Sequence, residues 1–227
     1  MSEPWPTEPT TLVALQVELG AAHPPAWSGG LEPALGGCFV CFAGGGSASG
    51  DAGDEGWAAA TVLAGRHLIA SAEVRGRAGA PYMAGLLAAR EGPLLETAVH
   101  SLDDPPDLLM VNATGRDHPR RAGLALHLGW VLDIPTVGVT HRPLVASGPL
   151  PAPASGATSA LTIDGEQVGW WFRTRSGARP VAVSPGWRVG LDTALEVMKT
   201  TSGSARTVEP IRQARRLART ARSRNQA

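Results

Sequence analysis

Residues 107–130, DLLMVNATGRDHPRRAGLALHLGW, decide the fold because an apolar run, a glycine turn and a helical pattern follow one another there. The run Leu108–Val111 has the length of a buried strand, Gly115 breaks it, and Arg120–Leu128 begins a helical pattern. A strand, a turn and a helix in this order are typical of a site at the carboxyl end of a strand. The side chain at that end is Asn112, which offers a metal ion only an amide dipole, whereas a hard divalent cation needs ionised carboxylates.

Length and composition predict one α/β domain, because 227 residues with 43% apolar content can build a sizeable core. The formal net charge of zero is unevenly spread. Residues 205–227 hold seven arginines and one glutamate, so this segment carries about +6 and the remainder about −6. An arginine-rich terminal segment is either a phosphate-binding element or a solvated helix. We predict a flexible N-terminus over residues 1–11, a domain over 12–204 and an arginine-rich C-terminal helix over 205–227.

Two further features bear on location and redox chemistry. No uncharged run of 18 apolar residues occurs and the first residues lack a signal-peptide pattern, so we predict a cytoplasmic protein without membrane contact. Cys38 and Cys41 have the CxxC spacing of a redox pair or half of a zinc site. They lie in a strand-like run that would point them to opposite faces, and no second pair completes four ligands, so structural thiols are favoured.

The remaining pattern predicts a ribonuclease H-like fold, a mixed central sheet with an antiparallel meander flanked by helices. Residues 44–56, rich in glycine, are expected to be a flexible connection without the Lys-Ser/Thr of a phosphate loop. The helix over 86–100 is expected to be interrupted near Gly92-Pro93. The other predicted helices cover residues 12–22 and 191–199, and the predicted strands cover residues 35–42, 57–63, 67–74, 108–111, 136–139, 161–163, 168–173 and 181–184.

The chain carries three collinear segments, PYMAGLLAARE at 81–91, NATGRDHPRRAGLALHLGWVLDIPTVGV at 112–139 and GWRVGLDTAL at 186–195. Together with LVALQVEL and Glu209-Pro210, these segments resemble the endonuclease V family of deoxyinosine-directed nucleases. The resemblance implies the ribonuclease H-like fold and hydrolysis of a phosphodiester near a deaminated purine. In that family acidic side chains gather one or two magnesium ions that polarise the phosphate and activate water.

The resemblance also implies which positions would hold the metal. The first-strand aspartate of the family falls at Phe39 and the central-strand aspartate falls at Asn112. The glutamate of the family is matched by Glu91 and the late-helix aspartate by Asp192, although both could instead be surface acids. Because two of four acids are substituted, no bound metal is expected, with Mg or Mn required only if residual activity remains.

Other positions are carried over from the same motifs. Tyr82 matches the wedge tyrosine that fills the space of a displaced base, and His141 stands where the family has a lysine close to the phosphate. His118 is either catalytic or an orienting group, and Ala113 replaces a glycine of the base pocket. The catalytic candidates are Glu91, Asp192, Asn112, His118 and His141, and the substrate-binding candidates are Tyr82, Gly85, Gly115, Arg120, Arg121 and Gly138.

The leading hypothesis is therefore a family member that has lost metal-dependent cleavage and still binds DNA or RNA. The binding elements would be the loop at 79–85 that carries Tyr82, called the wedge loop, Arg120-Arg121 and the C-terminal helix. A second hypothesis is that the cleft serves small-molecule chemistry, for example in biosynthesis, with His118 and His141 as proton-transfer groups. A third is weak residual Mg- or Mn-dependent nuclease activity.

Overall fold

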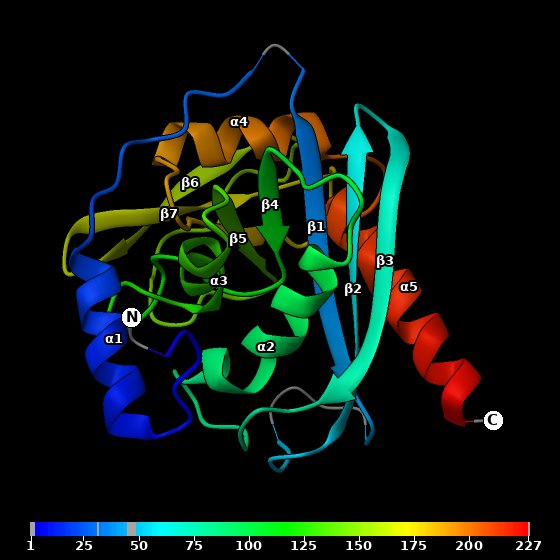
Figure 1. Ribbon diagram of the computed structural model, residues 1–227. Helices are drawn as coiled ribbons and strands as arrows, with labels where there is room; N and C mark the ends of the chain where they lie inside the picture. Colours follow the sequence, from blue (N-terminus) through cyan, green and yellow to red (C-terminus); the bar gives the residue numbers. More distant parts are fainter. Residues whose placement is uncertain (1–2, 31, 45–48, 227) are drawn as a thin grey trace.

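A single eight-stranded mixed sheet with helices on both faces forms the protein, as the computed structural model shows for residues 3–30, 32–44 and 49–226 (Figure 1). The strand order is β3-β2-β1-β4-β5-β8-β7-β6. This is the predicted ribonuclease H-like fold with its antiparallel meander β1-β2-β3. The elements are α1 (Pro9–Ala21), β1 (Ala34–Phe42), β2 (Glu55–Ala64), β3 (His67–Arg77), α2 (Leu87–His100), β4 (Leu108–Val111), α3 (Leu124–Leu132), β5 (Thr136–Thr140), β6 (Thr158–Ile163), β7 (Glu166–Phe172), β8 (Val181–Pro185), α4 (Leu191–Thr201) and α5 (Glu209–Gln226).

The two faces of the sheet carry separate cores. Helices α2 and α3 pack on one face around Leu109 and Val111, and α4 and α5 pack on the other face around Leu108 and Met110. All four residues of β4 are buried, which explains why a central strand covered on both faces is a continuous apolar run. The predicted strand 108–111 and the predicted hairpin turning at Gly65, whose φ is +57°, are confirmed.

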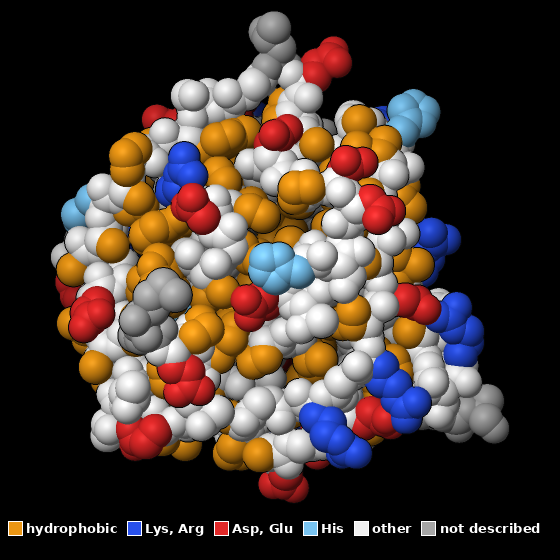
Figure 2. Space-filling view, in the orientation of Figure 1, with side chains coloured by type: hydrophobic (Ala, Val, Ile, Leu, Met, Phe, Trp, Pro, Cys, Tyr) orange, Lys and Arg blue, Asp and Glu red, His pale blue; other side chains and the backbone are white. Residues whose placement is uncertain are grey.

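The C-terminal helix is an integral layer of the fold. Along α5 the side chains of Ile211, Ala214, Ala218 and Ala221 are buried. The backbone of Pro210 lies so close to Gly37 of β1 that a side chain at Gly37 would overlap it. The arginines of α5 are therefore held at fixed positions against the sheet. In Figure 2 the Lys and Arg side chains gather along the edge formed by β3 and α5.

Two helix boundaries differ from the predictions. The expected interruption at Pro93 is wrong: α2 continues through it, because burial of apolar residues on both sides outweighs the one lost backbone hydrogen bond. The helix expected from Arg120 begins only at Leu124. Arg121 has a φ of +56°, in the left-handed region, so the residues before Gly123 form turns and cannot join the helix.

The predicted flexible N-terminus is also wrong where the structure describes it. Helix α1 begins at Pro9, and Trp5 is buried. The Trp5 indole N–H donates to Glu96 at 2.6 Å, and its ring stacks on His127 with centroids 4.5 Å apart. A large aromatic side chain with a satisfied polar end fixes the segment that carries it. Residues 1–2 of the predicted flexible segment lie outside the described residues.

The glycine-rich connection over 44–56 is anchored in its described second half. Arg90 of α2 donates to the Asp51 carbonyl at 2.7 Å and pairs with the Asp54 carboxylate at 2.8 Å. These charge-assisted bonds hold the segment against α2, contrary to the prediction of a flexible connection. Residues 45–48 of this connection lie outside the described residues. No helix in the described part of the chain combines the length and hydrophobicity needed to cross a bilayer.

Candidate functional site

A cleft of about 320 Å³ opens where the central strands end. Strands β1, β4 and β5 run parallel, and β4 ends at Val111, opposite Cys38. Because β1 continues to Phe42, four of its residues extend beyond the end of β4. The cleft forms over this free length. It is lined by residues 38–42 of β1, Leu87, Glu91 and Leu95 of α2, Asn112, His141, and Arg215, Arg219 and Arg222 of α5.

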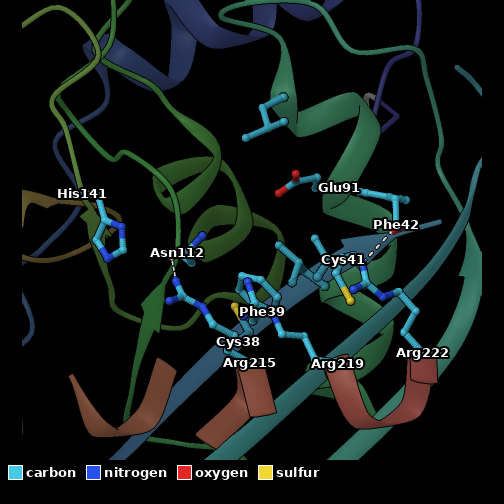
Figure 3. A pocket seen from close by; sticks show the side chains of 13 residues that line it. Cys38, Phe39, Cys41, Phe42, Glu91, Asn112, His141, Arg215, Arg219 and Arg222 are labelled. Atoms are coloured by element: carbon cyan, nitrogen blue, oxygen red, sulfur yellow. Dashed lines mark hydrogen bonds between the residues drawn. The ribbon is translucent and has the colours of Figure 1, made fainter. Parts of the chain in front are cut away.

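One wall of the cleft is formed by arginines at i, i+4 and i+7 of α5. The Arg215 guanidinium donates to the Asn112 side-chain oxygen at 2.9 Å, and its Cζ lies 5.0 Å from the centroid of the Phe39 ring (Figure 3). Arg219 lies over the same ring at 5.9 Å. Arg222 donates to the Phe42 carbonyl at 3.3 Å. Residues at this spacing share one side of a helix, so three cations face the cleft together.

The opposite wall carries one carboxyl group. Glu91 of α2 is 6% exposed, and Figure 3 shows its carboxyl end directed into the cleft. Burial raises the pKa of Glu91 to about 8, although the neighbouring Arg90 lowers it. Glu91 is therefore mostly protonated near neutral pH.

His141, at the end of β5, adds little charge at neutral pH. It is exposed and its Nε2 lies 3.4 Å from the Thr207 hydroxyl oxygen. Partial burial and the nearby cations Arg206 and Arg215 lower the pKa of His141. The positive charge of the cleft therefore comes from α5.

A second cavity, of about 280 Å³, adjoins the first and shares Asn112 and Leu87 with it. Tyr82 and Met83 of the wedge loop form one side, and Ala113 and Leu144 contribute to the lining. Tyr82 and Ala113, the predicted wedge tyrosine and the predicted pocket substitution, therefore line the same cavity. The structure places this second cavity, with a mixed polar and apolar lining, directly beside the cationic cleft.

The carbonyl oxygen of Gly85 fixes the wedge loop. It accepts hydrogen bonds from Gln16 Nε2 at 3.1 Å and from Arg120 at 2.9 Å, and His118 Nε2 lies 3.0 Å away. The backbone N–H of Arg120 donates to His118 Nδ1 at 3.3 Å, which assigns the neutral tautomer with hydrogen on Nε2. Burial lowers the pKa of His118 to about 4, in agreement with that form. Of the two roles predicted for His118, its contacts favour the orienting one.

Asp117 holds the opposite rim of the second cavity and was not singled out from the sequence. This carboxylate is 1% exposed and accepts backbone hydrogen bonds from Leu144 at 2.7 Å, Val145 at 3.0 Å and Ala146 at 2.8 Å. A buried carboxylate that takes three N–H donors is a strong anchor. No sequence signal marks this role, because its partners lie 27 to 29 residues away.

Asp192 is a predicted catalytic residue that the structure does not bring to the cleft. It is exposed on the first turn of α4. Helix α4 follows β8, which is antiparallel to β5 and ends beside the amino end of β5, at Val137. Asn112 and His141 follow the carboxyl ends of β4 and β5, so Asp192 lies at the other end of the sheet. The five proton-transfer and ligand candidates therefore do not converge.

Several predicted substrate-binding residues have structural contacts instead. The Arg120 guanidinium is bound to Gln16 Oε1 at 2.7 Å and to the Gly85 carbonyl, and Arg121 pairs with Glu166 at 3.2 Å. Gly115 and Gly138 line neither cavity. A side chain at Gly115 would overlap the Pro185 carbonyl oxygen, and one at Gly138 would meet the Ala113 carbonyl oxygen at 2.5 Å. These two glycines permit close packing of the turn after β4.

The donor set of the cleft does not fit a divalent cation. Among the residues that the structure describes, no three His, Cys, Asp or Glu side chains are close enough to hold a metal ion. The Asn112 oxygen is occupied by Arg215, Phe39 has no donor atom, and Glu91 is a single carboxyl group. A cation such as Mg²⁺ requires several oxygen ligands and would be repelled by three guanidinium groups.

The arginines of α5 line the cleft, a position that the sequence alone did not predict. The positive charge of residues 205–227 is visible in the sequence, and the i, i+4, i+7 spacing of Arg215, Arg219 and Arg222 is the signal that predicts a common face. Which strand that face meets is set by tertiary packing.

Cys38 and Cys41 behave as the sequence predicts. Both are free; Cys38 is buried with the α2-side core, and Cys41 is half-buried near Arg219 and Arg222 on the α5 side. Burial raises the pKa of both thiols. They lie on opposite faces of β1.

A mixed sheet of this order, with a polar cleft at the carboxyl ends of its central strands, places the chain among ribonuclease H-like proteins. The family model described as Endonuclease V matches residues 42–216. The chain belongs to the Endonuclease V family.

Curated relatives and solved structures agree. An Endonuclease V of Gloeobacter violaceus is 47% identical over 136 residues, which are 59% of this chain and 55% of that protein. An Endonuclease V of Streptomyces coelicolor is 42% identical over 166 residues, covering 72% of this chain and 71% of that protein. The crystal structure of Endonuclease V from Streptomyces avermitilis has a TM-score of 0.84 at 34% identity, covering 98% of this chain and 96% of that chain. The sequence match thus spans little more than half of the Gloeobacter relative.

A further similar structure contains nucleic acid. The Endonuclease V of Ciona intestinalis, in complex with DNA containing an inosine followed by a ribo-adenosine, has a TM-score of 0.76 at 19% identity. It covers 95% of this chain and 97% of that chain. At this identity the likeness concerns the fold.

Proposed function

We propose that this chain is an Endonuclease V homologue that binds nucleic acid carrying a deaminated base and has lost the metal-dependent cleavage of its family. The observation that carries the proposal is the Arg215 guanidinium bonded to Asn112 and stacked over Phe39, at the two positions where the family resemblance implies aspartates. Electrostatic groups that stabilise a transition state are each commonly worth about 3 to 4 kcal/mol. Loss of two such ligands removes most of the chemistry.

Binding is supported by the second cavity. Tyr82 lies on a loop fixed through the Gly85 carbonyl, and the cavity beside it is suited in size to a nucleobase. The inosine-containing DNA bound by the Ciona relative makes nucleic acid the ligand class to test first. An aromatic side chain beside such a cavity can stack on a base or fill its place, a contact worth about 1 to 3 kcal/mol per base.

The test measures binding and cleavage on the same oligonucleotides. We expect inosine-containing strands to bind more tightly than guanosine-containing ones in magnesium, without product formation in magnesium or manganese. Tyr82→Ala should weaken binding by about ten-fold or more, following the stacking energy. Leu150→Ala, which removes a 68% exposed side chain outside both cavities, is the matched control.

Two outcomes would overturn the proposal. Absence of binding at low salt would remove nucleic acid as the ligand. Metal-dependent cleavage that disappears in Glu91→Ala but persists in Asp192→Ala would show a retained nuclease, because only Glu91 lies in the cleft.

A further inference from the structure

We propose that Arg215, Arg219 and Arg222 form a metal-independent binding site for the phosphodiester groups of one nucleic-acid strand. This inference rests on the proposed function and concerns how the strand is held. It assigns to three side chains of α5 the role that a divalent cation plays in related nucleases, namely to provide positive charge at the ends of the central strands. Unlike a metal, the guanidinium groups supply charge without activating water.

The first observation is that Arg215 is held in place before any ligand binds. It contacts Asn112 at 2.9 Å, Thr207 at 3.4 Å and the Phe39 ring. Its Nε is buried and no described residue accepts a hydrogen bond from it. A guanidinium has five N–H donors, so Arg215 retains donors for a phosphate. Because its rotamer is already fixed by Asn112 and Phe39, binding loses little side-chain entropy.

The second observation is the free charge beside it. Among the described residues the Arg219 guanidinium forms no hydrogen bond and lies 5.9 Å from the centroid of the Phe39 ring, and the Arg222 guanidinium donates to a backbone carbonyl at 3.3 Å. Neither contact neutralises the positive charge of its arginine. Two other arginines of α5 are paired with carboxylates, Arg212 with Glu209 at 2.7 Å and Arg224 with Glu73. Arg216 bonds the neutral Gln213 side chain at 2.9 Å and lies outside the cleft, and none of the three arginines that line the cleft pairs with a carboxylate among the described residues.

The third observation is the spacing along the helix. From Arg215 to Arg222 the helix axis rises by about 10 Å, since each residue adds about 1.5 Å. The arginines thus present charge over a length suited to successive phosphates of a single strand. The cleft shares Asn112 and Leu87 with the cavity beside Tyr82, so a base in that cavity would direct its own backbone into the cleft. The sole carboxyl group that faces these arginines across the cleft, among its described lining residues, is Glu91.

The experiment measures the salt dependence of binding to a single-stranded oligonucleotide that carries one inosine. For single strands, each neutralised phosphate contributes about 0.7 to the slope of log K against log salt. The Arg215→Gln, Arg219→Gln, Arg222→Gln triple variant should therefore lower the slope by about 2. At 0.1 M salt this corresponds to a loss of affinity of about 100-fold. Affinity of the unmodified protein should be the same in EDTA and in magnesium.

The matched control is the Arg212→Gln, Arg216→Gln, Arg224→Gln triple variant. It removes the same charge from the same helix at exposed positions that do not line the cleft. We expect the control to lose less than half of the slope lost by the cleft variant. The single variant Arg219→Gln, whose side chain makes no hydrogen bond that holds the fold among those described, tests the site without risk to folding and should lower affinity about five-fold.

The outcomes separate this inference from the proposed function. Tight binding with equal slopes for the two triple variants would overturn the arginine site and leave nucleic-acid binding intact. Loss of binding in EDTA would overturn metal independence. Failure of every form to bind any oligonucleotide would overturn both.

Discussion

The Asn112→Asp variant distinguishes two explanations of the cleft, a site that binds phosphate and a metal site that lacks one ligand. The substitution is nearly isosteric and places a carboxylate where the amide oxygen lies 2.9 Å from the Arg215 guanidinium. At an effective dielectric constant of about 20, two unit charges at this distance attract by about 6 kcal/mol. Desolvation of the carboxylate offsets several kcal/mol, which leaves a net gain on the order of 1 to 2 kcal/mol.

This pairing has two consequences. The new carboxylate neutralises Arg215, so one phosphate contact is lost and affinity for an inosine-containing strand should fall about five-fold at 0.1 M salt. Manganese should still fail to bind, because the carboxylate is already occupied by a guanidinium.

The assay combines oligonucleotide anisotropy, manganese titration calorimetry and a cleavage measurement on the same variant. Manganese-dependent cleavage by Asn112→Asp alone would refute the reasoning, because it would mean that Arg215 leaves the carboxylate readily. The Asn112→Asp, Arg215→Ala double variant is the comparison. Freed from its partner, the carboxylate should bind manganese together with Glu91 more strongly than in the single variant.

Three further predictions concern the residues that hold the site. Asp117→Asn should lower the free energy of unfolding by about 3 kcal/mol and speed hydrogen exchange at the amides of residues 144–146, because charge-assisted bonds are lost. The folded-state pKa values of His118 and His127 are about 4, below the unfolded value near 6.5, so their contribution to stability is complete above pH 6.5 and is lost as pH falls toward 4. Urea unfolding should show that the free energy of unfolding falls by about 3 kcal/mol for each histidine as the pH is lowered, and that it falls less in His127→Gln than in the unmodified protein. An equal fall in the variant and the unmodified protein would contradict this prediction. Gly115→Ala should destabilise the protein by about 3 kcal/mol in thermal unfolding, because its side chain would overlap a backbone carbonyl oxygen.

The sequence predicts the elements of the sheet well because their signals are local. Leu108–Val111 is apolar throughout since both faces are covered, and the turn at Gly65 separates two strands of matching length. The boundary at Leu124 could not be predicted, because the left-handed backbone at Arg121 is set by packing of the preceding turn. The burial of Trp5 could not be predicted either, because Trp5 packs against Gly92 and His127, which lie far away along the chain.

The candidate site is predictable only in part, for a related reason. Motif positions locate Glu91, Asn112 and Tyr82, because they lie on segments whose order along the chain is preserved in the resemblance. Asp192 is misplaced by the same reasoning, since a matching motif does not say at which end of the sheet it lies. The role of Arg215 depends on a contact across 103 residues, which no local pattern encodes.

The residues at 39, 112 and 215 are physically coupled, so their identities make sense only as a set. With carboxylates at the first two positions, a guanidinium at 215 would be bound between them and would exclude both a metal ion and a phosphate. With an amide at 112 the guanidinium is oriented but keeps its charge, and with an aromatic ring at 39 it gains a cation–π contact without being neutralised. This combination leaves the positive charge of Arg215 unneutralised in the cleft. It therefore supports the proposal that the cleft attracts a phosphate backbone, since the residues at positions 39 and 112 would not by themselves place an arginine over both positions.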